Sequence, residues 1–162
     1  NMITITNHAL EKADGVTAAK LFEAAFRNLN RDRISFRNMT EVLRDFGIDL
    51  KDLECEEDGD EDMPLYMLYN ADAKTYGAAI MLKNGCLEYV RNAVGDFYIL
   101  PSSVHELMII PKYTNLQHSH TKMLRMVQDI NQSSVDLIDQ LSDNIYVYDG
   151  ELKMITEEDD TL

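Results

Sequence analysis

Four side chains that could do acid–base or nucleophilic chemistry lie within five residues of one another. They are Ser102, Ser103, His105 and Glu106, in the stretch FYILPSSVHELMIIP. A serine hydroxyl becomes a nucleophile when a base lies within hydrogen-bond reach and a third group orients that base. Alternate residues of an extended chain share a face, so Ser103 and His105 would lie together. The spacing therefore permits a hydrolase-type site.

The same stretch also fits a turn between two buried strands. Pro101 interrupts an apolar run, and serine hydroxyls readily hydrogen-bond to the backbone of a turn. The sequence has no glycine-rich nucleophile elbow, and no oxyanion hole is identifiable in it. We therefore favour the turn and keep a catalytic role for Ser102, Ser103, His105 and Glu106 as the alternative.

Other patterns that could hold a cofactor or a metal are incomplete. The chain contains neither a G-x-G-x-x-G nor a G-x-x-x-x-G-K-[ST] phosphate loop. The acidic run Glu54–Asp62 aligns with an EF-hand loop around Gly59, but the position of the bidentate glutamate falls on Leu65. His118 and His120 offer two nitrogens without a third zinc ligand. We expect no cofactor and no metal site.

The charge of the chain bears on its partners. The 162 residues carry a formal net charge of −14, from 29 acidic and 15 basic residues. A field of that sign repels phosphate backbones and anionic lipids, which argues against nucleic acid and membrane partners. Acidic residues crowd Glu54–Asp62 and Glu157–Asp160, whereas basic residues outnumber acidic ones over Lys20–Lys51. The leading hypothesis is a non-catalytic domain that binds a protein or peptide, or that self-associates through these segments.

The cysteines and the hydropathy bear on location. Cys55 and Cys86 are the only cysteines, and they follow no disulfide or zinc spacing. This usage is typical of a reducing compartment, so we expect a cytoplasmic protein. No signal peptide is visible, and no apolar run approaches the ~20 residues of a membrane span. The chain opens Asn1-Met2, which leaves open that an upstream segment is missing.

The part of the chain before the acidic run is expected to be mainly helical, over residues 1–50. Thr17 can cap a helix over residues 18–29. Its apolar residues recur every three or four positions, the spacing of a helix that packs on a core. In chain order we then expect an extended piece over residues 33–39, a helix over 39–46 that Gly47 ends, and an acidic loop over 51–63.

Residues 64–156 are expected to be rich in strands. The apolar runs LYMLYN, AAIML, FYIL and ELMII predict four strands, the last two on either side of PSSVH. The helices expected between strands are NGCLEYVRNAVG capped by Asn84, TKMLRMVQDIN with Met123, Val127 and Ile130 inward, and SSVDLIDQLS capped by Ser133 or Ser134.

The clearest local signal is near the C-terminus of the chain. NIYVYDGELKMI alternates apolar and polar residues around Asp149-Gly150, which predicts a hairpin with a two-residue turn. Strands with helices inserted between them predict an α+β fold, with a largely antiparallel sheet, helices packed on it and a C-terminal β-hairpin. We expect one domain over residues 1–162, ending in an acidic tail over 157–162.

The order of several motifs resembles a known family. Gly77-Ala78-Ala79, the stretch ILPSSVHE, the spacing of Asn131 and Val135, and the stretch LSDNIYVY are similar to motifs of the bacterial domain-of-unknown-function family 5688. The resemblance covers about two-thirds of the chain, from residue 64 onward. Members of that family are typically longer, so the resemblance implies a C-terminal portion of a bacterial cytoplasmic protein. It implies no activity, cofactor or catalytic residue.

Overall fold

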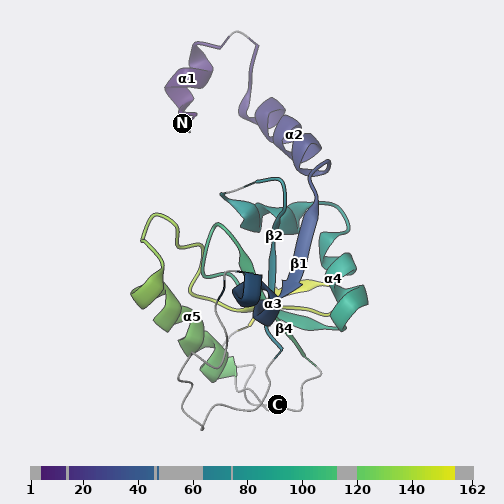
Figure 1. The fold of residues 1–162 in the computed structure, drawn as a ribbon. Coiled ribbons are helices and arrows are strands. Elements are labelled where there is room, and N and C mark those ends of the chain that lie inside the picture. The colour runs from purple at the N-terminus through teal and green to yellow at the C-terminus, as the bar shows by residue number, and fades with distance from the viewer. Residues whose placement is uncertain are drawn as a thin grey trace.

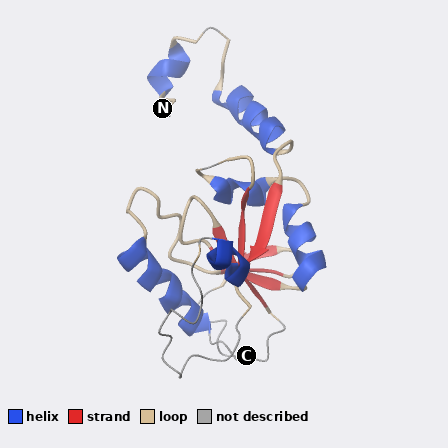
Figure 2. Cartoon of the chain, viewed as in Figure 1, coloured by secondary structure: helices blue, strands red, loops and turns tan. Residues whose placement is uncertain are grey.

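The computed structural model describes residues 5–13, 15–45, 47, 64–73, 75–112 and 120–155. The acidic run Glu54–Asp62, His118 and the tail 157–162 lie outside these ranges. Figures 1 and 2 show a central sheet with helices on both sides. The elements in chain order are α1 (Asn7–Glu11), α2 (Ala18–Leu29), β1 (Ile34–Asn38), α3 (Met39–Asp45), β2 (Tyr66–Asn70), the 3₁₀ helix η2 (Gly77–Leu82), α4 (Cys86–Val94), β3 (Phe97–Leu100), β4 (Leu107–Pro111), α5 (His120–Ser134), β5 (Tyr146–Tyr148) and β6 (Leu152–Met154).

The sheet has six antiparallel strands in the order β1-β2-β4-β3-β5-β6. Three pairs that follow one another in the chain lie side by side: β1 with β2, β3 with β4, and β5 with β6. The pair β3–β4 is central, and FYIL and ELMII form it as predicted. The α+β class, the antiparallel sheet and the C-terminal hairpin are thus confirmed.

Each face of the sheet carries its own apolar core. On one face, Leu68 and Ile99 pack with Ile80 of η2 and Val90 of α4. On the opposite face, Leu100 and Ile110 pack with Met123 and Val127 of α5. The alternation of side chains along β3 sends Ile99 and Leu100 to opposite faces. Figure 2 shows α4 and α5 on opposite sides of the sheet.

The helix α2 begins as predicted but packs differently. The Thr17 hydroxyl accepts a hydrogen bond from the Lys20 N–H at 3.3 Å, which caps the helix. No residue of α2 is buried, and the Phe22 side chain is 67 % exposed. Only its last residue, Leu29, packs against the core. Figure 1 shows α1 and α2 extending beyond the end of the sheet, so the expected packing of the whole apolar stripe on the core is wrong.

Four local predictions are corrected by the structure. AAIML lies in η2 and is not a strand, because Gly77 and Ala78 enter a close contact with another segment, described below. The residue before α4 is Gly85, at φ +74°, so Asn84 does not cap that helix. The helix α5 runs through Ser133 and Ser134, so neither serine starts a new helix. The hairpin turn has three residues, because Tyr148 pairs with Leu152.

Within the described ranges, no helix is long and apolar enough to cross a bilayer.

Candidate functional site at a junction of three segments

The stretch between β3 and β4 is held by a second, distant segment. The Val104 N–H donates to the Asp139 carbonyl at 2.8 Å, and the Leu141 N–H donates to the Ser102 carbonyl at 3.2 Å. Ser103 and Gln140 form an isolated antiparallel bridge. Ser102 and Ser103 are buried by this pairing. The predicted turn therefore also pairs with residues 139–142, which follow α5.

A third segment, Tyr76–Ala78, closes the junction. The Ala78 N–H donates to the Val104 carbonyl at 3.2 Å, and the Tyr76 N–H donates to His105 Nδ1 at 3.0 Å. A Cβ atom on Gly77 would meet the His105 carbonyl oxygen at less than any real contact distance. Tyr76 takes a left-handed conformation, at φ +58°. Only glycine at position 77 lets the two backbones approach this closely.

The predicted catalytic side chains are close together, but they are engaged elsewhere. The Ser103 hydroxyl accepts a hydrogen bond from the backbone N–H of His105 at 3.0 Å. The His105 ring accepts from Tyr76 at Nδ1, and its Nε2 faces Asp139 Oδ2 at 3.4 Å. With Nδ1 accepting, the neutral ring carries its proton on Nε2.

These contacts are those of a turn. In the part of the chain that the structure describes, neither ring nitrogen of His105 meets a serine hydroxyl, which a Ser–His nucleophile requires. Ser102 is buried and Glu106 is half-buried. The catalytic role of Ser102, Ser103, His105 and Glu106 stays a prediction, without the hydrogen bond that would activate the nucleophile.

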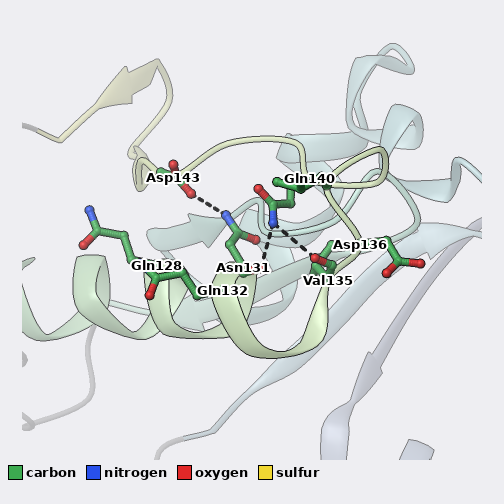
Figure 3. Close-up of a pocket in the computed structure, with 8 residues that line it drawn as sticks. Gln128, Asn131, Gln132, Val135, Asp136, Gln140 and Asp143 are labelled. Atoms are coloured by element: carbon green, nitrogen blue, oxygen red, sulfur yellow. Dashed lines mark hydrogen bonds between the residues drawn. The ribbon is translucent and has the colours of Figure 1, made fainter.

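Two amide side chains tie residues 139–143 to the end of α5. Asn131 Nδ2 donates to the Ser142 carbonyl at 3.1 Å and to Asp143 Oδ1 at 2.6 Å. Gln140 Nε2 donates to the carbonyls of Asn131 and Val135, at 2.7 and 3.1 Å. Figure 3 shows the bond from Asn131 to Asp143 and the two bonds from Gln140. Gln140 thus satisfies the carbonyl of Asn131, which lies in the last turn of α5, and the carbonyl of Val135, the residue after the helix.

A pocket lies on each side of the segment 140–143. The polar pocket has a volume of about 770 Å³ and is lined by Gln128, Asn131, Gln132, Asp136, Gln140 and Asp143, among others. The apolar pocket has a volume of about 300 Å³ and is lined by Met81, Ile99, Pro101, Leu141, Tyr146 and Leu152, among others. The hydrogen bonds of Asn131 and Gln140 were not predicted from the sequence. The one signal for them was the spacing of Asn131 and Val135 in the family motif.

The apolar pocket sits where the covered sheet face becomes exposed. Residues that pair directly across an antiparallel sheet share a face. One such row runs from Ile109 through Ile99 and Tyr146 to Met154. Ile99 is fully buried beneath η2 and α4, whereas Met154 is 51 % exposed. The apolar face therefore continues past its covering helices onto the edge strand β6.

Cys86 and His120 are two other titratable groups of the described structure. Burial raises the pKa of the Cys86 thiol to about 11, so it is not a thiolate nucleophile at neutral pH. His120 Nε2 lies 3.2 Å from the Tyr98 hydroxyl. Among the described residues, no group of three or more His, Cys, Asp or Glu side chains could hold a metal ion.

The motifs that suggested a family meet at this junction. They supply Gly77 and Ala78, the paired stretch 99–106, the amide of Asn131, and Leu141-Ser142, whose N–H groups bond to that stretch. No curated protein and no solved structure matches the chain. The model of one family, described as a family of unknown function (DUF5688), matches residues 1–150. The match thus includes the N-terminal helices and strands β1 to β5, and the chain belongs to the DUF5688 family.

Proposed function

We propose that the domain binds an extended, basic segment of another protein at the apolar pocket and along the edge strand β6. The observation that supports this most directly is the apolar face left uncovered beyond β5. Leu152 and Leu141 both line the apolar pocket and are 45 % and 46 % exposed. Exposed apolar surface that continues a core and surrounds a pocket marks an interaction site.

The edge of the sheet favours an extended ligand. In the described ranges, β6 pairs with β5 alone, so the outer side of its backbone is unpaired by any strand. All three residues of β6 are exposed. An added strand would hydrogen-bond to this edge while one of its apolar side chains enters the pocket.

The charges near this edge favour a basic partner. Glu151 precedes the pocket residue Leu152 and lies next to the edge strand β6. Lys153 is already paired with Asp149 at 3.2 Å and with Glu151 at 3.6 Å. Arg91, which lies beside Gly150 of the same hairpin, is paired with Asp96 at 2.8 Å. With a net charge of −14, the chain attracts basic peptides and repels acidic ones.

A pair of designed peptides tests this function. One alternates leucine and valine with lysine, and the other carries glutamate in place of lysine. We expect the lysine peptide to bind the full chain in a calorimetric titration, and the glutamate peptide not to bind. Leu152→Glu places a charge at the pocket mouth, so it should weaken binding of the lysine peptide by at least about tenfold, the effect of ~1.4 kcal/mol.

The matched control is Phe26→Glu in α2, where the side chain is 44 % exposed, as Leu152 is. It adds the same charge in α2, which contributes no residue to the lining of the apolar pocket, and should leave binding unchanged. Equal binding of the two peptides, or equal loss in both variants, would show that the contact is nonspecific and would overturn the proposal.

A further inference from the structure

We infer that the polar pocket is a binding site for an alkylammonium group. The inference starts from Asn131, which lines this pocket and is only 3 % exposed. Its Oδ1 atom is buried and has no hydrogen-bond partner. A buried amide oxygen without a donor is costly, and it is a natural acceptor for a ligand.

The amide orientation of Asn131 follows from its neighbours. Its Nδ2 atom lies between the Ser142 carbonyl and the Asp143 carboxylate, both of which only accept hydrogen bonds. Exchanging the oxygen and nitrogen would set Oδ1 against these two acceptors. The unpartnered atom of Asn131 is therefore the oxygen.

In the two amide side chains of this pocket, Asn131 and Gln140, the N–H groups are hydrogen-bonded and the oxygens are not. Both hydrogens of Asn131 Nδ2 and both hydrogens of Gln140 Nε2 bond to the protein. Within the described structure, no hydrogen bond reaches Gln140 Oε1 or the Asp136 carboxylate. The ligand that complements such a surface is a donor without acceptors, and an ammonium group is one.

The carboxylates favour a positive ligand and an elongated one. Figure 3 shows the side chains of Asn131 and Gln140 pointing toward each other, with Asp143 on one side and Asp136 on the other. A single metal ion needs its oxygen ligands within one coordination sphere. Here the carboxylates of Asp143 and Asp136 lie on opposite sides of the Asn131 and Gln140 amides. This arrangement suits an ammonium group carried on an alkyl chain better than a metal ion. The source would be a free polyamine or the side chain of a lysine.

Titrations of the full chain with small amines test the inference. Spermidine represents the free amine, and the amide of Nα-acetyl-lysine represents the lysine side chain. At fixed ionic strength, we expect at least one of them to shift the amide resonances of residues 128–143. Tetramethylammonium has the charge but no N–H donor, so it should cause no such shift. The more tightly bound amine identifies the source.

Asp136→Asn removes one charge, and the wild-type carboxylate makes no hydrogen bond within the described residues. We expect it to weaken amine binding by about threefold or more, a typical exposed ion-pair effect. Asp129→Asn makes the same change on α5 outside the pocket lining and should have no effect. Absence of amine binding, equal shifts with tetramethylammonium, tighter binding of Ca²⁺, or equal loss in both variants would overturn the inference.

This site is separate from the proposed peptide site. The residues that line the polar pocket do not line the apolar pocket. Leu152→Glu should therefore leave amine binding unchanged, and Asp136→Asn should leave the apolar anchor in place. Either proposal can fail while the other holds.

Discussion

Gly77 sets how closely two segments of the junction approach. A Cβ at this position would meet the His105 carbonyl and, at 3.2 Å, the Asn70 nitrogen. Both are backbone atoms, which cannot rotate away. We expect Gly77→Ala to lower the free energy of unfolding by about 2–3 kcal/mol, as overpacking does. Urea denaturation measures it.

The control for Gly77→Ala is Ala79→Ser, which adds one atom at an exposed position of the same helix. It should stay within about 0.5 kcal/mol of the wild type. Equal stability of the two variants would mean that the junction has room for a methyl group.

Glu88 links the stability of the fold to pH. The Tyr148 hydroxyl donates to Glu88 Oε1 at 2.5 Å, and this bond lowers the pKa of Glu88 below its ordinary value of 4.5. The stabilisation is present above pH 4.5 and is lost as the pH falls through the lowered pKa. The same bond raises the pKa of Tyr148 above 10, so that contribution is lost only as the pH rises through the raised value.

Glu88→Gln keeps an acceptor for Tyr148 but removes the titration. We expect the free energy of unfolding of the variant to fall less than that of the wild type between neutral pH and pH 3. We also expect it to fall less than that of the wild type between neutral pH and strong alkali. Urea midpoints across the pH range measure both differences. Parallel curves for the two proteins would show that this pair does not contribute to the pH dependence.

At the scale of the elements, Gln140 joins the end of α5 to the junction. Gln140→Ala would remove the donor to two carbonyls, that of Asn131 in the last turn of α5 and that of Val135 just after the helix. We expect a loss of about 1–2 kcal/mol in the free energy of unfolding, measured in urea. Gln132→Ala on the exposed side of the same helix should change it by less than about 0.5 kcal/mol. A small effect at both positions would mean that water replaces the Gln140 amide.

The sequence predicted elements wherever periodicity and local turn chemistry agreed. β3 and β4 follow from short apolar runs on either side of a turn signal, α4 from helical spacing, and the C-terminal hairpin from alternation around Asp149-Gly150. The prediction of a strand at AAIML was wrong because a short apolar run fits a strand and a buried helix equally well. The packing predicted for the apolar residues of α2 was wrong for another reason. Helical spacing shows that one face of a helix is apolar, but not that another element covers it.

The candidate site was predictable only in part. The local turn at Ser102–His105 follows from its own residues, and the Ser103 hydroxyl does bond to the backbone. Its partners are more than 25 residues away on either side, at Tyr76–Ala78 and at residues 139–142. Nothing in single-residue propensity encodes such a distant pairing. Both pockets depend on that pairing, so neither was visible in the sequence.

The charge of the whole molecule should make its stability depend on salt. A net charge of −14 opposes the compact state by self-repulsion, and salt screens this repulsion. Ion pairs such as Arg33–Asp72 and Arg91–Asp96 are screened too, but exposed pairs contribute little to stability. We expect the melting temperature to rise from low to moderate NaCl. A fall would mean that the ion pairs outweigh the net charge.

The order of strands also separates the sheet into parts that open independently. β3 and β4 have strand neighbours on both sides, whereas among the described strands β6 pairs with β5 alone and buries no side chain. Local opening costs least where little apolar surface is exposed by it. Amide protons of β6 should therefore exchange with solvent deuterium well before those of Ile99 and Ile109. β6, the strand that we propose pairs with a peptide, is thus also expected to separate readily from β5. A strand from another chain could then compete for the place of β6 beside β5.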